Sequence, residues 1–128
     1  MAKARDYMTT DVVVLAPEMS VHSAMQLLLE HDISGAPVVD DRGDLVGLLT
    51  GRDIIGAVFR ASYFKDLGET VGRTMSREVQ TVDAETDLME IIELFLRSRY
   101  RRFPVLSGPR LVGMLSRVDI LRAIEELW

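Results

Sequence analysis

The stretch LVGLLTGRDI, residues 45–54, decides the fold because the chain repeats it as LVGMLSRVDI at residues 111–120. Each copy begins with a short apolar run around one glycine, which predicts a buried strand. Each then passes through Thr or Ser, followed three residues later by Asp, into apolar residues at helical spacing. We therefore expect the hydroxyl and the carboxylate to lie where a strand ends and a helix begins.

The duplication extends upstream of this stretch. Pro37 and Val38 match Pro104 and Val105 at a displacement of 67 residues, and the apolar positions of a preceding helix match at the same displacement. The displacement falls to 66 in the turn between the paired strands, where the loss of one residue is well tolerated. The chain is thus predicted to use one unit of about 60 residues twice.

Hydrophobic periodicity and turn residues predict the same element order in both copies. The first copy is expected to hold strand 12–15, helix 21–32 with Ser20 as N-cap, strand 36–39, strand 45–49 and helix 51–65. The second is expected to hold strand 79–82, helix 87–98, strand 103–106, strand 111–115 and helix 117–127, with a lead-in helix at 3–8 and a linker at 66–73. Pro37 should lie at a strand start or an edge, because it cannot donate to a ladder.

This order predicts an α/β fold, or α+β if the hairpins are counted separately. One such unit is marginal for a core of its own. The two β-α-β-β-α repeats are therefore expected to pack together with approximate two-fold symmetry.

Composition narrows the function classes. The chain has 128 residues, of which 48% are hydrophobic and 27% charged, as in an ordinary globular protein. No apolar run approaches the roughly 20 residues that span a bilayer, and the first residues lack the apolar core of a signal peptide. The absence of cysteine suits a cytoplasmic protein. A net charge of −5 argues against general nucleic-acid binding, with the arginine cluster at 97–102 as the exception.

Thr50 with Asp53, and Ser116 with Asp119, admit two interpretations. A hydroxyl residue followed three positions later by an acid is a helix-capping pattern, and spacing alone favours that interpretation. A carboxylate at a helix start can also accept hydrogen bonds from sugar hydroxyls while the helix N-terminus faces phosphate. The two are compatible, because the hydroxyl can cap while the carboxylate points outward.

Catalysis and metal binding find little support in the sequence. His22 and His31 are nine residues apart, which is not the spacing of a chelating pair on a helix. No phosphate-binding loop, nucleophile elbow or zinc-protease motif is present, and no nucleophile–base pair is readable. We expect neither a resident metal nor an enzyme.

The repeated pieces together resemble a tandem pair of cystathionine β-synthase (CBS) domains, a Bateman module. The matching pieces are YMT at 7–9 with TMS at 74–76, APVVD at 36–40 with FPVL at 103–106, and the stretch quoted first. The resemblance covers the chain from about residue 6 to 126 and places one domain at 6–65 and the other at 73–128. No single motif is specific, but their order, spacing and repetition are.

The resemblance implies two clefts between the repeats that bind adenosine-containing ligands: AMP, ADP or ATP, in some relatives S-adenosylmethionine or a dinucleotide such as NAD. The ribose-binding carboxylates would be Asp53 and Asp119, each preceded by a hydroxyl, Thr50 or Ser116. The adenine pockets would be lined by backbone around Val12, Ala36 and Pro37 and around Val79, Phe103 and Pro104. No cofactor beyond such a nucleotide is implied.

The repeats differ at their basic positions. Arg101 and Arg102 stand where the first repeat has Ser34 and Gly35, and Arg117 stands where it has Gly51. These arginines either bind the phosphate of a ligand, for which the guanidinium fork is well suited, or form a solvated basic face. If they bind phosphate, the two clefts are inequivalent.

The leading hypothesis is a non-catalytic regulatory module that senses a nucleotide, forms a homodimer and signals to a separate partner protein. A ligand-independent dimerisation or docking scaffold is the alternative, with the Asp residues serving only as caps. Nucleic-acid binding through residues 97–102 is a further, weaker alternative.

Overall fold

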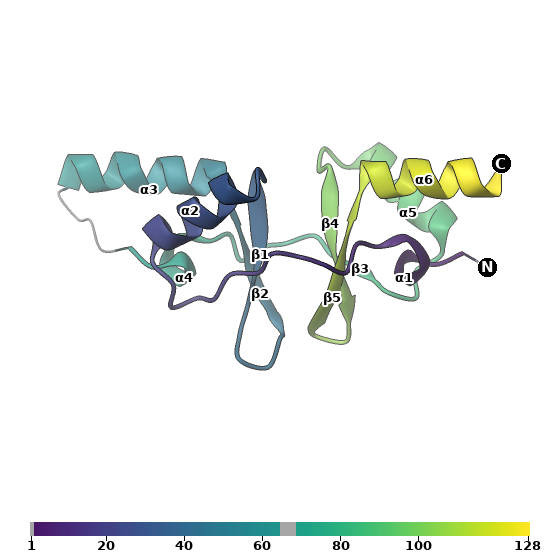
Figure 1. Cartoon of the computed structure of the whole chain (residues 1–128), viewed down its shortest axis with the longest axis horizontal. Helices are drawn as coiled ribbons and strands as arrows, with labels where there is room; N and C mark the ends of the chain where they lie inside the picture. Colours follow the sequence, from purple (N-terminus) through teal and green to yellow (C-terminus); the bar gives the residue numbers. More distant parts are fainter. Residues whose placement is uncertain (1, 65–68) are drawn as a thin grey trace. The chain divides into compact units, whose positions relative to one another are not determined.

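The computed structural model describes residues 2–64 and 69–128, without the side chains of residues 62–64. Its helices and strands alternate as expected for the α/β class, which is confirmed (Figure 1). In chain order they are α1 (Ala4–Tyr7), α2 (Val21–Glu30), β1 (Gly35–Val39), β2 (Leu45–Thr50), α3 (Gly51–Phe64), α4 (Val71–Thr74), β3 (Val82–Asp83), α5 (Leu88–Arg97), β4 (Arg102–Ser107), β5 (Arg110–Ser116) and α6 (Arg117–Leu127).

The chain folds into two compact units that exchange their leading segments. The first unit is Val13–Val79, and the second combines Met1–Val12 with Gln80–Trp128. Residues 2–12 thus precede the first repeat in sequence but lie with the second. The Arg5 N–H donates to the Ala84 carbonyl at 3.0 Å, and Thr9 and Met114 exchange both backbone hydrogen bonds at 2.8 and 2.9 Å. The segment 74–76 precedes the second repeat in sequence but lies with the first unit. There Ser76 and Leu48 exchange two backbone hydrogen bonds of 2.9 Å each.

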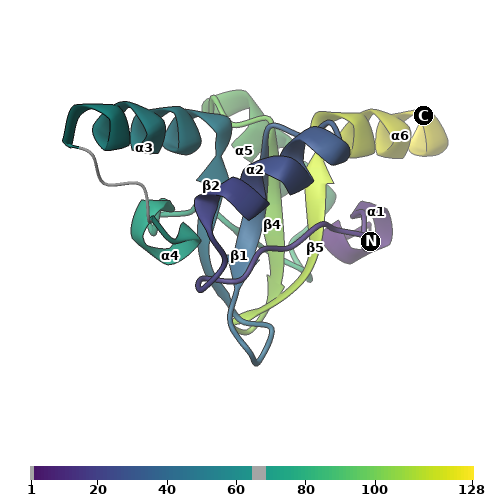
Figure 2. The same cartoon turned by 60° about the vertical axis from the view of Figure 1, so that its left-hand side comes forward.

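The first unit is built on the antiparallel hairpin of β1 and β2, with Gly35 opposite Thr50. Ser20 begins α2 by accepting a hydrogen bond from the Ser23 N–H, as predicted. Helix α2 then packs its apolar stripe against the hairpin (Figure 2). The buried core comprises Leu15, Val21, Ala24, Leu28, Ala36, Val38, Leu49, Ile54, Val71 and Met75.

The second unit holds a three-stranded sheet in the order β3-β4-β5, with β3 parallel and β5 antiparallel to β4. Helices α5 and α6 cover it, as their buried residues show (Figure 1). Phe103 is fully buried at its centre, with its ring edge-on to Phe95 at 4.8 Å between centroids. The buried core comprises Ala4, Val82, Ala84, Leu88, Ile91, Phe103, Val105, Leu115, Ile120 and Ala123.

Both prolines lie inside a strand rather than at its start, but β1 is an edge strand of its two-stranded sheet, so Pro37 occupies the edge position that was the other part of the expectation. Pro104 is opposite Met114, whose backbone groups bond Thr9 instead of β4, and β3 begins its pairing one residue later, at Val105. Pro37 likewise faces Leu48, whose backbone bonds Ser76. No ladder hydrogen bond is lost at either proline, so the sheets tolerate them.

Three predicted elements need correction. Residues 12–15 form no strand: only Leu15 pairs, in a parallel bridge with Val38, while the preceding Val14 is 42% exposed. The strand predicted at 79–82 forms instead at Val82–Asp83. Part of the predicted linker 66–73 is helical, because α4 begins at Val71, whose side chain is fully buried. Residues 65–68, which include the predicted end of helix 51–65, lie outside the described residues. At 12–15 only one residue meets a partner strand, so no ladder forms, whereas the strand near 82 is limited to the two residues that pair with β4.

The glycine of each quoted stretch is required by the exchanged segment. A Cβ on Gly47 would lie 2.5 Å from the Met75 sulfur, and one on Gly113 would lie 2.7 Å from the Met8 sulfur. Real Cβ atoms do not approach other atoms so closely. The motif glycines therefore make room for the methionines of YMT and TMS.

No helix in the described ranges is long and apolar enough to cross a membrane.

Replacing Gly113 by Ala should lower the free energy of unfolding by about 1–3 kcal/mol, because the added methyl group overpacks the Met8 contact. Gly51→Ala is the matched control, since a Cβ there meets only the Ser34 carbonyl at 3.7 Å. Urea denaturation measures both. Equal midpoints for the two variants would contradict this role of the motif glycine.

Candidate functional site

The strand-to-helix junction of the second unit is organised by Asp119. Its Oδ2 accepts hydrogen bonds from the Ser116 N–H at 2.8 Å and the Ser116 hydroxyl at 3.0 Å. The Asp119 N–H donates back to the Ser116 hydroxyl at 3.3 Å. This is a complete capping box at the start of α6, so the capping interpretation of the pattern is correct for this oxygen.

Asp53 makes the same arrangement at the start of α3. Its Oδ2 accepts from the Thr50 N–H at 2.9 Å and from the Thr50 hydroxyl at 3.0 Å. The Asp53 N–H donates to that hydroxyl at 3.3 Å. Figure 1 shows α3 and α6 beginning where β2 and β5 end, so the two units carry equivalent junctions.

The other carboxylate oxygen, Oδ1, distinguishes the two junctions. In the second unit it accepts from the Thr9 hydroxyl at 3.2 Å and lies 3.6 Å from the Arg122 guanidinium, and Asp119 is only 4% exposed. In the first unit Oδ1 of the half-buried Asp53 has, among the described residues, one hydrogen-bond donor, the Ser76 hydroxyl at 3.5 Å. Asp53 thus keeps one oxygen more available than Asp119.

Thr9 and Ser76 are functional-site candidates that the motif spacing did not single out. Each belongs to a leading segment, 7–9 or 74–76, and reaches the carboxylate through the exchange described above. The signal was present in the duplication, because both segments end in a hydroxyl residue at the same displacement.

Partial burial, with the charges of Glu126 and Asp6, raises the pKa of the neighbouring Tyr7.

The structure places the predicted arginines beside the second junction. The Arg117 N–H donates to the Arg101 carbonyl at 3.2 Å, so the turn before β4 lies against the start of α6. Arg101, Arg102 and Arg117 all have exposed side chains. In the described residues none of the three forms an ion pair with a carboxylate. They are available to an anion at this helix start.

The predicted lining residues contribute backbone rather than side chains. Ala36, Pro37, Phe103 and Pro104 are buried in the cores of their units. Val12 and Val79 are half-buried and close the exchanged segments, so Val12 belongs to the unit of Phe103 and Val79 to the unit of Ala36. The resemblance groups Val12 with Ala36 and Val79 with Phe103 as pocket lining, and that grouping stays a prediction.

In the part of the chain that the structure describes, no three His, Cys, Asp or Glu side chains come together in a group that could hold a metal ion. His22 and His31 are both exposed on or beside α2.

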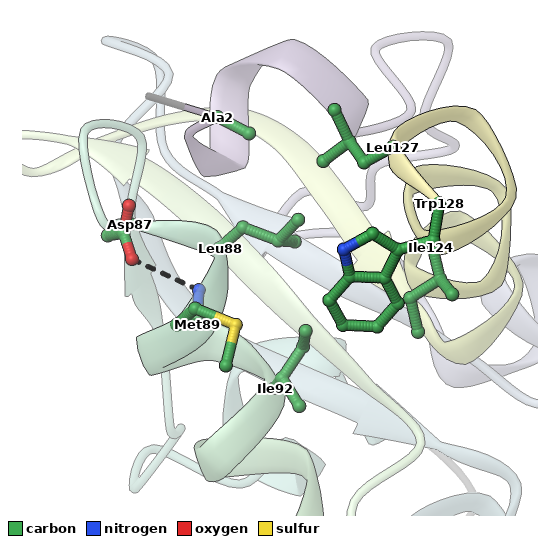
Figure 3. Close-up of a pocket in the computed structure, with 8 residues that line it drawn as sticks. All are labelled: Ala2, Asp87, Leu88, Met89, Ile92, Ile124, Leu127 and Trp128. Carbon is green, nitrogen blue, oxygen red and sulfur yellow. Dashed lines mark hydrogen bonds between the residues drawn. The ribbon is translucent and has the colours of Figure 1, made fainter.

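A separate hollow of about 190 Å³ lies between α5 and α6 in the second unit (Figure 3). Its walls are apolar, with Leu88, Ile92, Ile124 and Trp128 facing it. Among the described residues that line it, Asp87 is the one with a carboxylate side chain, and that side chain already caps α5 by accepting from the Met89 N–H at 3.1 Å. None of the predicted ligand residues lines this hollow.

Comparison with known proteins identifies the repeat. The CBS domain matches residues 4–60 and 68–126. Hypoxic response protein 1 of Mycobacterium tuberculosis is 32% identical over 126 residues, which are 98% of this chain and 87% of that protein. The crystal structure of CBSX2 in complex with AMP superposes with a TM-score of 0.86 at 30% identity and covers 99% of this chain and 98% of that one. CBSX2 is a CBS-pair protein from Arabidopsis thaliana. The structure of Hypoxic Response Protein I, which has two coordinated zinc ions, superposes with a TM-score of 0.82 at 32% identity, covering 96% of this chain and 99% of that one.

Asp119→Ala should cost about 1–3 kcal/mol of unfolding free energy, because it removes a buried carboxylate that accepts hydrogen bonds from Ser116 and Thr9 and caps α6. Asp53→Ala should cost about 1 kcal/mol or less, since water can replace the carboxylate at this half-buried position. Chemical denaturation without any ligand measures the difference. Equal losses would contradict the inequivalence of the two junctions.

Proposed function

Because this chain belongs to the CBS-domain family, matching it over both halves, we propose that it is a regulatory module that binds an adenosine-containing nucleotide and signals to a protein partner. The observation that carries the proposal is the duplicated junction. Each Asp uses Oδ2 to cap its helix and turns Oδ1 toward a neighbouring hydroxyl, where a ligand hydroxyl can take that place. The AMP complex of CBSX2 supports the ligand class.

The roles of the site residues follow from their chemistry. Asp53 and Asp119 accept hydrogen bonds from the ribose hydroxyls, since an ionised carboxylate is an acceptor only. Thr50 and Ser116 hold these carboxylates in place through the cap. The backbone beside the buried residues is suited to an adenine ring, because it offers both donors and acceptors. The residues whose backbone is meant are Ala36, Pro37, Phe103 and Pro104, with Val12 and Val79 at the ends of the exchanged segments.

Phosphate recognition is assigned to Arg101, Arg102 and Arg117. Their exposed guanidinium groups form no ion pair with a carboxylate within the described residues, and their backbone lies beside the start of α6, with Arg117 bonded to Arg101 and Arg102 opposite Ser116. Both the fork of an arginine and the helix N-terminus favour a phosphate.

Signalling requires that the ligand prefers one arrangement of the protein over another. The exchanged segments provide a physical route, because Thr9 and Ser76 contact the carboxylates directly. A ribose that displaces these hydroxyls would change how the leading segments are held. The proposed module has no catalytic step.

A homodimer is part of the proposal. Helix α3 exposes Ile55 and Val58, and α6 exposes Val118 and Leu121, the last by 64%. Apolar side chains of this size at such exposure are typical of surfaces that associate.

Thermal melting with AMP, ADP, ATP, S-adenosylmethionine and NAD should show stabilisation by at least one of them, because a ligand that binds only the folded state raises the melting temperature. At a concentration of 100 times Kd the gain is about 2.7 kcal/mol. The shift should be reduced in Asp53→Ala or Asp119→Ala, each measured against its own ligand-free baseline.

The control is Asp41→Ala, because Asp41 lies in the exposed hairpin turn of the first unit and takes no part in a helix start. No shift with any of the five compounds would favour the ligand-independent docking scaffold.

Leu121→Glu should convert a dimer into a monomer, because it places a charge in an apolar interface. Sedimentation of the wild type and the variant measures the mass. Leu29→Glu is the control, because Leu29 on α2 is also a largely exposed leucine, at 74%. A wild-type protein that sediments as a monomer at all concentrations would contradict the proposal.

A further inference from the structure

The two helix starts lie beside turns of opposite charge. The turn before β1 is EHDISG at residues 30–35, and the turn before β4 is RSRYRR at 97–102, at the same displacement of 67. The first has two acidic residues, Glu30 and Asp32, where the second has Arg97 and Arg99. Arg101 and Arg102 then add two positive charges where the first turn has none.

The same backbone bond holds each turn at its junction. The Gly51 N–H donates to the Ser34 carbonyl at 2.8 Å, and the Arg117 N–H donates to the Arg101 carbonyl at 3.2 Å. The charges are therefore placed alike with respect to α3 and α6. Since a Debye length is about 8 Å at physiological ionic strength, charges on a turn that touches the helix start act on a ligand bound there.

The basic side chains of the turn before β4 are mostly without an ion pair in the described structure. Among residues 97–102 only Arg97 pairs with a carboxylate in the described structure, that of Glu93 at a distance of 3.8 Å. In the first unit the basic residues next in sequence to Asp53 and Ser76 are Arg52, at the second position of α3, and Arg77, whose guanidinium donates to the Gly72 carbonyl at 3.4 Å. The adjacent Glu78 offsets one of these charges.

The carboxylates differ in the opposite sense. Asp119 is buried, and its second oxygen already has Thr9 and Arg122 as partners. Asp53 is half-buried, and its second oxygen has only the long contact with Ser76. The start of α6 thus combines exposed arginines with a carboxylate whose second oxygen already has hydrogen-bond partners. The start of α3 combines a less occupied carboxylate with acidic neighbours.

We propose that the two junctions select different adenosine compounds: the Arg-rich start of α6 binds a phosphorylated nucleotide chiefly through its phosphate, and the start of α3 binds an uncharged nucleoside chiefly through its ribose. This rests on the proposed function, because both ligands are adenosine compounds. At the start of α6 the phosphate meets up to three arginine forks and a helix N-terminus. At the start of α3 the carboxylates of Glu30 and Asp32 disfavour a phosphate, while the Asp53 carboxylate accepts the ribose hydroxyls.

Calorimetric titration with AMP and with adenosine tests the proposal. Two variants are compared with the wild type. The first is the double variant Arg101→Gln with Arg102→Gln. The second is Asp53→Asn, a substitution that keeps the size of the capping side chain. The charge-matched control is Arg73→Gln with Arg110→Gln, two exposed arginines away from both helix starts. Far-ultraviolet circular dichroism confirms that each variant is folded before titration.

We expect the Arg101/Arg102 variant to weaken AMP roughly tenfold or more and to leave adenosine unchanged. Asp53→Asn should weaken adenosine and leave AMP unchanged. AMP titrated into protein saturated with adenosine should keep its Kd, and salt should weaken AMP far more than adenosine.

Competition between AMP and adenosine, or an equal loss of both ligands in each variant, would overturn the division between the junctions and leave the proposed function intact. Binding of neither compound, nor of any nucleotide in the melting experiment, would overturn both. Equal weakening of AMP in the charge-matched control would show a general charge effect and would also overturn the assignment to Arg101 and Arg102.

Discussion

The structure depends on a two-bond backbone bridge that ties each leading segment to the hairpin of the other repeat. Thr9 bonds Met114, and Ser76 bonds Leu48, through both backbone groups. This bridge extends each hairpin by one partner and seats a methionine on the motif glycine. It also delivers a hydroxyl to the carboxylate that caps the next helix. Folding of each unit and assembly of its candidate site are therefore the same event.

This coupling explains why one side chain can serve both stability and binding. The carboxylate has two oxygens, and the cap needs only one of them. A buried polar group must be satisfied, so the second oxygen finds a hydroxyl when no ligand is present. A sugar hydroxyl is chemically equivalent to the Thr9 or Ser76 hydroxyl, and it can replace that hydroxyl without leaving the carboxylate unpaired.

Duplication produced equivalent backbones with different surroundings. The backbone bonds of the two junctions agree closely, because both follow from the same strand-to-helix geometry. The exposed turn before each hairpin is under no such constraint, and there the charges diverge from Glu30 and Asp32 to the arginines of residues 97–102. Exposed positions tolerate such changes at little cost in stability, so they are where two copies of one unit can acquire different ligands.

The sequence alone determined the repeat, the class of the fold, the hairpins and the helix starts at Thr50 and Ser116, because each depends on local periodicity or capping. It misplaced the short strands near 12–15 and 79–82, since stretches of four residues have no local signal that separates a bridge from a strand. Only the tertiary structure decided which leading segment joins which hairpin. That exchange is made by backbone hydrogen bonds, which any residue can form and which therefore leave little trace in side-chain pattern. The unequal burial of Asp53 and Asp119 is likewise tertiary, because identical capping motifs predict identical local geometry and only the packing around them differs.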